Sequence, residues 1–256
     1  MKRSRLFLAL LLCLALALQL SSALGEIVPV TLSDEGCTCD SSAVTCEGSK
    51  VTISAPGEYM LTGTLSDGQI IVDCAEDGKV TLHLNNAVIH NETGAAILVG
   101  HVSPRIRISL TAGSENQLSN GSKLVFTDSD EPNGVIFSRS DLTIEGSGKL
   151  TVTAGDFDGI VSKDDLRIEG GEITVTSVRH GIRGKDSVEI YDGVINVTCG
   201  KDGLRATNSK DPDRGFIAVS GGQITIVCGD DPLDYVTSLN ITGGTINGQV
   251  RPSAAQ

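Results

Sequence analysis

Apolar and polar residues alternate in short runs along most of the chain, and one arrangement of them returns at regular intervals. The starts of five similar segments are 24, 22, 29 and 22 residues apart, and the longest interval contains an insertion over 209–215. A repeat of this length is typical of solenoid architectures. The segments are LTIEGSGKLTVT from Leu142, LRIEGGEITVT from Leu166, VEIYDGVINVT from Val188, IAVSGGQITIV from Ile217 and LNITGGTINGQ from Leu239.

Each repeat predicts three short strands. An alternating strand leads into a Gly-rich corner, a second alternating strand and a polar turn, and a third strand follows, anchored at Ile160, Ile182, Leu204 or Leu233. Alternation with a period of two buries one face of each strand. We therefore expect an all-β fold, a single-stranded right-handed parallel β-helix with three short strands per coil. A β-sandwich is the alternative, but it needs hairpin turns and no such repeat.

The upstream half follows the pattern less regularly. It predicts strands over 51–53, 70–72, 80–84, 97–99, 106–110 and 135–138, and a long polar loop between Gly113 and Gly134. We divide the chain into a signal peptide (1–25), a Cys-containing N-terminal segment or cap (26–50), the β-helix (51–250) and a C-terminal tail (251–256).

The first residues have the features of a secretory leader. A basic start precedes an apolar run from Leu6 to Leu18, and Ala23 and Gly25 supply the small residues of a cleavage site. The run is too short to span a membrane. We expect cleavage near Gly25, a secreted, extracellular protein and no membrane insertion.

Charge and composition narrow the partners. The chain has 20 Lys and Arg against 32 Asp and Glu, a formal charge of −12, which disfavours nucleic acids and anionic membranes as partners. It has no Trp, so the core must come from Val, Ile and Leu, and recognition of sugars is expected to be ionic rather than by stacking.

Stacking of the coils converts sequence columns into surface rows, because equivalent residues lie about 4.8 Å apart. Around the third strand, two rows point outward: Phe137, Val161, Arg183 and Arg205, then Arg139, Lys163, Lys185 and Thr207. The five basic residues among them form what we call the basic stripe: Arg139, Lys163, Arg183, Lys185 and Arg205. Carboxylates flank it at Asp158, Asp164, Asp186 and Asp202, with His180 in the column of Asp158 and Asp202.

The stripe suits an acidic polymer, and the flanking carboxylates are hard oxygen ligands of the kind that Ca²⁺ takes. The alternative is a salt-bridge ladder in which Lys163 pairs with Asp164 and Lys185 with Asp186. The pattern alone does not choose between the two. Aspartate before glycine is also an ordinary turn residue.

Six cysteines follow the leader, and an even number in a secreted chain indicates disulfides. Cys199 and Cys228 occupy one column of adjacent coils, within the roughly 4.4–6.8 Å that a disulfide needs, so we predict a bond between them. Two free thiols facing the core are the alternative. Cys37, Cys39, Cys46 and Cys74 allow three pairings, and zinc is a competing ligand for the first three.

Signals of catalysis are weak. The four His residues form no repeated triad with serine, and His180-Gly181, Arg183-Gly184-Lys185 and Asp230-Asp231 resemble parts of a pectin-hydrolase site in the wrong chain order. We therefore predict no catalytic residues.

Long segments resemble one family. VIFSRSDLTIEGSGKLTVTAGDFDGIVSKDDLRIEGGEITVT, HGIRGKDSVEI and DGLRATN are similar to a family of secreted, mainly clostridial carbohydrate-binding β-helix proteins with a pectate-lyase-like fold. The resemblance implies binding of Ca²⁺, cellulose and acidic sugars such as polygalacturonate, without established catalysis. His180 stands where the family has Asp, and Asp231-Pro232-Leu233 replaces Asp-Gly-Ile.

Together these observations predict a non-catalytic extracellular protein, a monomer that binds pectic and cellulosic polysaccharide of the plant cell wall with Ca²⁺. The alternative is a Ca²⁺-dependent, pectate-lyase-like polysaccharide lyase in which Lys163 or Arg183 abstracts a proton. A third possibility is a structural adhesin segment with no affinity for soluble polysaccharide.

Overall fold

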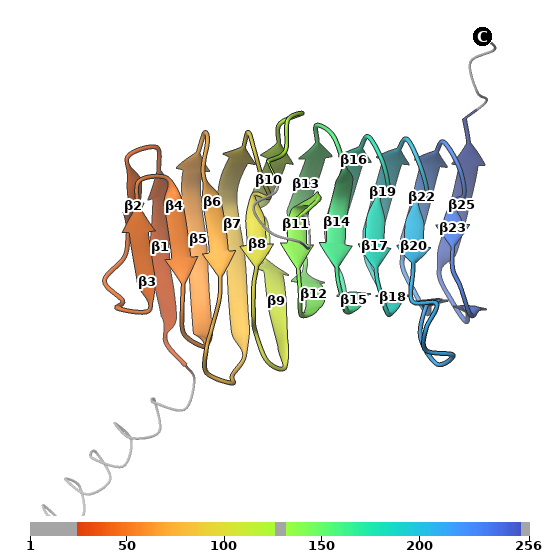
Figure 1. Cartoon of the computed structure of the whole chain (residues 1–256), viewed down its shortest axis with the longest axis horizontal. Helices are drawn as coiled ribbons and strands as arrows, with labels where there is room; N and C mark the ends of the chain where they lie inside the picture. The colour runs from red at the N-terminus through yellow and green to blue at the C-terminus, as the bar shows by residue number, and fades with distance from the viewer. Residues whose placement is uncertain (1–24, 126–131, 252–256) are drawn as a thin grey trace, which may run out of the picture.

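A computed structural model describes residues 25–125 and 132–251 of the 256-residue chain. The predicted leader and the end of the predicted tail lie almost wholly outside these ranges. Within them the chain forms strands and turns, and no helix is long and apolar enough to cross a membrane. Figure 1 shows the strands stacked side by side along one axis.

From β9 onward, each coil contributes one strand to each of three rows, in agreement with the predicted repeat (Figure 1). The first row contains β9 (Arg105–Leu110), β12 (Asp141–Gly146), β15 (Asp165–Ile168), β18 (Ser187–Ile190), β21 (Phe216–Val219) and β24 (Leu239–Ile241). The second contains β10 (Glu115–Asn120), β13 (Lys149–Ala154), β16 (Glu172–Ser177), β19 (Val194–Cys199), β22 (Gln223–Cys228) and β25 (Thr245–Val250). The third contains β3 (Val44–Glu47), β4 (Lys50–Ile53), β6 (Gln69–Val72), β8 (Ile97–Val99), β11 (Gly134–Ser138), β14 (Asp158–Ser162), β17 (Ile182–Gly184), β20 (Leu204–Ala206) and β23 (Leu233–Asp234).

Pairing between coils is parallel and in register. Leu142, Leu166 and Val188 are successive partners in the first row, and their inward side chains are fully buried. The inward-facing buried residues of the three rows form one continuous, mainly aliphatic core between them. Because no strand buries its apolar face alone, stacking of the coils is what stabilises the fold.

Glycines shape the corner between the first and second rows. Gly171 and Gly193 occupy equivalent corners with φ of 96° and 115°, a region that side chains with a Cβ rarely adopt. Upstream, β7 (Val80–Asn91) runs through this corner without a break and pairs with both β9 and β10. Asn86 takes the turn there with φ of 58°, which explains why the upstream repeat is harder to see in the sequence.

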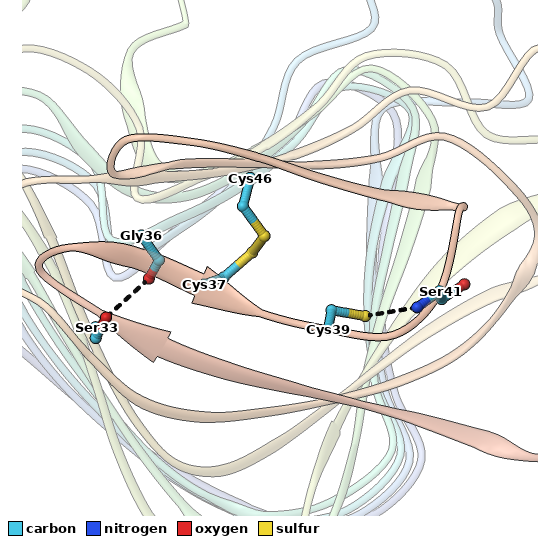
Figure 2. Close-up of a disulfide and its surroundings, with 6 residues drawn as sticks. All are labelled: Ser33, Gly36, Cys37, Cys39, Ser41 and Cys46. Carbon is cyan, nitrogen blue, oxygen red and sulfur yellow. Dashed lines mark hydrogen bonds between the residues drawn. A yellow bond between two sulfur atoms is a disulfide. The ribbon is translucent and has the colours of Figure 1, made fainter.

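The N-terminal segment, which is expected to form a cap, pairs with the strands of the first coils. Strand β1 (Ile27–Ser33) pairs with β5 (Gly57–Leu65) in parallel and with β2 (Gly36–Thr38) in the antiparallel sense, and β3 pairs with β4 in the antiparallel sense. A disulfide between Cys37 and Cys46, with Cα atoms 5.5 Å apart, connects β2 to β3 (Figure 2). Two of the three cysteines considered for zinc are therefore oxidised, and Cys39 is a free thiol that accepts a hydrogen bond from the Ser41 backbone N–H at 3.5 Å.

The polar loop expected between Gly113 and Gly134 is shorter than predicted, because β10 lies within it. The inward positions of β10 include Asn116 and Asn120, residues that are 1% and 5% exposed. Asn116 is satisfied there: its Oδ1 accepts from the Ala87 N–H at 3.0 Å and its Nδ2 donates to the Lys149 carbonyl at 3.0 Å. Polar residues at inward positions hide a strand from a hydrophobic pattern.

Candidate functional site

The third row brings together residues that the stacking argument places side by side. Ile160, Ile182 and Leu204 are successive register partners, and so are Arg183 and Arg205. Both arginines point away from the core on neighbouring strands, β17 and β20, and are partly exposed.

The other two members of that predicted outward row are covered rather than exposed. Phe137 and Val161 are 0% exposed and form a small apolar cluster with Ala95, against which Leu98 packs. This cluster lies on the opposite face of the third row from the main core. The outward row therefore presents charge only from Arg183 onward.

Asp158 and Asp202 occupy equivalent positions at or just before the third-row strand of their coils. Each accepts a hydrogen bond from a backbone N–H of the next coil, and we call this series of bonds the ladder. Asp158 Oδ1 accepts from the His180 N–H, and Asp202 Oδ1 accepts from the Asp231 N–H, both at 3.1 Å. The glycine that follows each of these residues is required by close packing: a Cβ on Gly159 would lie 2.3 Å from Val175 Cγ1. The ladder thus fixes the carboxylates beside the arginines.

Each arginine is positioned by these carboxylates. Arg183 donates from Nε to Asp158 Oδ2 and from Nη2 to Asn133 Oδ1, both at 2.8 Å. Arg205 donates from Nη1 to Asp202 Oδ2 at 3.0 Å, and its Nε lies 3.1 Å from Asp234 Oδ2. A guanidinium held by several partners presents its remaining N–H groups in a fixed direction.

His180 lies between the two arginines as an uncharged imidazole. Its Nε2 is 3.0 Å from the donor Arg205 Nη1 and its Nδ1 is 3.1 Å from Asp202 Oδ2, so the neutral ring accepts at Nε2 and donates from Nδ1. Burial lowers the pKa of His180, and the two arginines add to this against the opposing carboxylates of Asp158 and Asp202. The family's Asp at this position would carry a negative charge that the histidine lacks.

These residues line a cavity of about 220 Å³, which we call the basic hollow: Asn133, Asp158, Arg179, His180, Arg183, Arg205 and Thr207. Three arginines and one aspartate contribute to this lining, and Asp202 and Asp234 pair with Arg205 beside it. Arg179 lies over the ring of Phe157, 5.6 Å from the centroid. The sequence reasoning missed Arg179 and Asn133, although both occupy the column next to His180 and Asp158.

The basic residues of the second outward row, Arg139, Lys163 and Lys185, do not gather at one place. Arg139 lies 5.7 Å from the ring centroid of Phe137, Lys163 is half-buried, and the Lys185 ammonium is 4.0 Å from Asp186 Oδ1. The Lys185–Asp186 pair of the alternative salt-bridge ladder is therefore present. Arg139 lies beside the covered apolar cluster, two coils away from Arg183.

A second group of charges, the Asp164 cluster, comprises Asp164, Asp186 and Arg214. Arg214 belongs to the 209–215 insertion, and its Nη1 donates to both carboxylates. Burial, a hydrogen bond to Asp186 and the nearby charge of Asp141 raise the pKa of Asp164 to about 6. Burial opposes ionisation of Asp186, but hydrogen bonds from Asp164, Asn208 and Arg214 outweigh it and lower the pKa of Asp186. As the pH falls through about 6, Asp164 therefore takes up a proton while Asp186 stays ionised.

Residues 47–255 match the sequence model of a family described as carbohydrate-binding domain-containing proteins. The chain belongs to this family. A carbohydrate-binding domain-containing protein of Acetivibrio thermocellus is 43% identical over 199 residues, which cover 77% of this chain and 69% of that protein. A solved structure described as a polysaccharide lyase-like protein from C. thermocellum, in a gadolinium derivative, is 31% identical with a TM-score of 0.79, over 88% of this chain and 96% of the other.

Within this carbohydrate-binding domain, the four aspartates expected to hold Ca²⁺ do not meet at one point. Asp158 and Asp202 are bonded to arginines and backbone N–H groups, and Asp164 and Asp186 share Arg214. Over residues 25–125 and 132–251, no three carboxylate, histidine or cysteine side chains converge as metal ligands. The carboxylates of these aspartates therefore supply no group of three ligands for Ca²⁺ in these ranges.

The predicted bond between Cys199 and Cys228 is wrong for this structure, although the two cysteines are stacked as expected. Both are buried free thiols, and each donates to carbonyls near its own turn. Cys199 Sγ lies 3.3 Å from the Asp202 carbonyl, and Cys228 Sγ lies 3.4 Å from the Asp230 carbonyl. Because stacked residues of parallel strands direct their Cβ atoms in the same sense rather than toward each other, neighbouring coils satisfy the two thiols separately.

Proposed function

We propose that this domain binds acidic, uronate-containing polysaccharide at the basic hollow, without catalysis. The observation that supports the proposal best is the pair of register partners Arg183 and Arg205, with the uncharged His180 between them. Guanidinium groups bind carboxylates in a bidentate manner, and two of them on successive coils offer contacts about 4.8 Å apart. A polymer with regularly spaced carboxylates suits such a row.

The electrostatic setting favours an acidic group at this position over other parts of the surface. The chain as a whole carries −12, which repels polyanions, whereas the hollow presents three arginines. Local fields of this kind direct a charged ligand to one place. We propose pectic polysaccharide of the plant cell wall as the partner, bound by a single copy of the protein.

In this proposal Ca²⁺ links a carboxylate of the protein to carboxylates of the bound polysaccharide. Of the four candidate aspartates, Asp164 has the most exposed side chain, at 43%, whereas Asp158, Asp186 and Asp202 are at most 8% exposed. Ca²⁺ takes six to eight oxygens, so it would need uronate carboxylates of the ligand besides Asp164. We propose secretion as well, since a leader is predicted over 1–25 and the Cys37–Cys46 disulfide suits an oxidising compartment.

A polysaccharide lyase is the second candidate, favoured by the similarity to a polysaccharide lyase-like structure. Proton abstraction next to a uronate carboxylate needs a base. Arg183 is a poor one, because a guanidinium stays protonated and this one is bonded to Asp158 and Asn133. Lys163 is the other candidate base. Unsaturated products absorb in the ultraviolet, so incubation with polygalacturonate tests the lyase directly, and a sustained rise in absorbance contradicts a non-catalytic role.

The binding proposal is tested with charge-conserving variants. Arg183→Lys with Arg205→Lys keeps the net charge but loses the planar donor geometry, so we expect retention on a polygalacturonate affinity gel to fall by about tenfold. The matched control is Arg107→Lys with Arg251→Lys, which makes the same change outside the hollow. Equal retention of both double variants and the wild type contradicts binding through Arg183 and Arg205.

A further inference from the structure

Tyr191 is an exposed aromatic side chain in a protein with few of them. The chain has no Trp and three Tyr, of which Tyr59 is 1% exposed and Tyr191 47% exposed. It follows β18 in the first row, on a different row of strands from the arginines of the basic hollow.

The ring of Tyr191 is held in place by a chain of hydrogen bonds. Its hydroxyl donates to Glu189 Oε2 at 2.7 Å, and Glu189 Oε1 accepts from Arg167 Nε at 3.0 Å. Glu189 and Arg167 have side chains only 15% and 18% exposed. An exposed aromatic ring anchored through its hydroxyl loses little conformational entropy when a ligand stacks on it.

The outward side chains become smaller in the two coils that follow Tyr191. The column that contains Tyr191 reads Glu145, Glu169, Tyr191, Ser220 and Thr242 along the stack, and backbone hydrogen bonds join the last three to the preceding coils. The neighbouring column changes from Glu189 to Ala218 and Asn240. Large side chains therefore give way to small ones immediately after Tyr191.

A cavity of about 110 Å³ occupies the step, lined by Tyr191 and Glu189 on one side and by Ala218, Ser220, Asn240 and Thr242 on the other. Hydroxyl and amide groups both donate and accept hydrogen bonds, as sugar hydroxyls do. The combination of one oriented aromatic ring with neutral polar groups is the chemistry that recognises an uncharged sugar.

We propose that Tyr191 and the cavity beside it form a second sugar-binding site, which takes an uncharged pyranose ring of a polysaccharide. The site rests on the carbohydrate-binding function of the domain but not on the basic hollow. A protein with both sites connects an acidic chain on one row of strands to a neutral chain on another.

The test is titration of the full chain with two uncharged oligosaccharides, cellohexaose and mannohexaose, followed by calorimetry and by tyrosine emission, which no Trp obscures. We expect at least one of them to bind. Tyr191→Ala should weaken that binding by about tenfold, and Tyr191→Phe, which keeps the ring, by no more than about threefold. Tyr235→Ala is the control, because Tyr235 is 41% exposed but lies outside the cavity.

A second variant tests the cavity without altering the ring. Ala218→Leu fills it from the outward face of β21, so binding should fall as with Tyr191→Ala while the melting temperature stays within a few degrees of the wild type. Retention on polygalacturonate should be unchanged in both, which separates this site from the basic hollow. The proposal is overturned when neither oligosaccharide binds, when Tyr191→Ala binds as the wild type does, or when Tyr235→Ala loses as much.

Discussion

Arg183 reaches back across one coil to Asp158, whose carboxylate oxygen Oδ2 accepts from the arginine Nε at 2.8 Å. The Asp158 side chain is 2% exposed and that of Arg183 20%. The same carboxylate accepts from the His180 N–H, so it both joins two coils and orients a guanidinium of the basic hollow. Stability and ligand binding should therefore depend on the same residue.

Replacing Asp158 tests this link. Asp158→Ala removes the partner of Arg183 and leaves the His180 N–H unpaired, so we expect the free energy of unfolding to fall by about 2–3 kcal/mol. Asp158→Asn keeps an oxygen for the N–H and should cost about half as much. Urea denaturation measures both, and a loss below about 0.5 kcal/mol for the alanine variant contradicts a structural role for the pair.

The basic stripe leads to a prediction about ligand affinity. Replacing Lys163, Arg183 and Lys185 together with Ala should abolish retention on polygalacturonate, and added salt should weaken retention of the wild type, because screening acts within about 8–10 Å. The control is the triple variant of Lys50, Lys79 and Lys149, which removes equal charge elsewhere. Retention of the stripe variant at the level of this control means that the stripe contributes nothing specific.

The Asp164 cluster predicts how stability changes with pH. The pKa of Asp164 is raised from 3.8 to about 6, so between these values the folded protein binds a proton that the unfolded chain does not. Folding therefore gains stability from this group as the pH falls from 7 to about 4.5, and loses it as the pH rises through 6. The lowered pKa of Asp186 acts in the opposite sense only below about pH 4.

Thermal melting at pH 7 and pH 5 measures the effect, with Asp164→Asn as the matched variant. The asparagine should be less sensitive to pH over this range, because its amide does not titrate. A wild-type melting temperature that falls from pH 7 to pH 5 by as much as that of Asp164→Asn contradicts the assigned proton.

The role proposed for Ca²⁺ separates binding from folding. Since no three metal-ligating side chains converge in the described part of the chain, we expect equal melting curves in Ca²⁺ and in chelator without ligand. With polygalacturonate present, Ca²⁺ should strengthen retention of the wild type, and Asp164→Asn should remove that gain. A higher melting temperature in Ca²⁺ alone points instead to the intrinsic calcium site that the sequence predicts.

The sequence repeat alone predicts that Arg183 and Arg205 lie side by side on adjacent coils, because the repeat fixes the register of equivalent residues. It was not enough to show that Phe137 and Val161 are covered, since it does not reveal that Ala95 and Leu98 of an upstream coil cluster with them. Arg214 was missed for a similar reason: it belongs to an insertion that occupies no column. Tyr191 and the small residues in its column are visible in the sequence, but only the structure shows the cavity that they line.

The last prediction concerns the stacked thiols of Cys199 and Cys228, which the structure leaves reduced. Burial raises the pKa of Cys199 to about 12, with a further contribution from Cys228, and burial likewise raises the pKa of Cys228. The thiolate is the reactive form, so neither side chain should react with an aromatic disulfide reagent in the native protein near pH 8.

Cys39 is partly exposed and should react first, whereas Cys199, Cys228 and the buried Cys74 should react only after unfolding. Counting labelled peptides by mass spectrometry before and after addition of guanidinium distinguishes these classes. Cys199→Ser is an informative variant, because a hydroxyl keeps the hydrogen bond to the Asp202 carbonyl and should leave the labelling of Cys39 unchanged. Recovery of Cys199 and Cys228 as one disulfide-linked peptide from unreduced protein contradicts the reduced pair and restores the bond that the column spacing alone predicts.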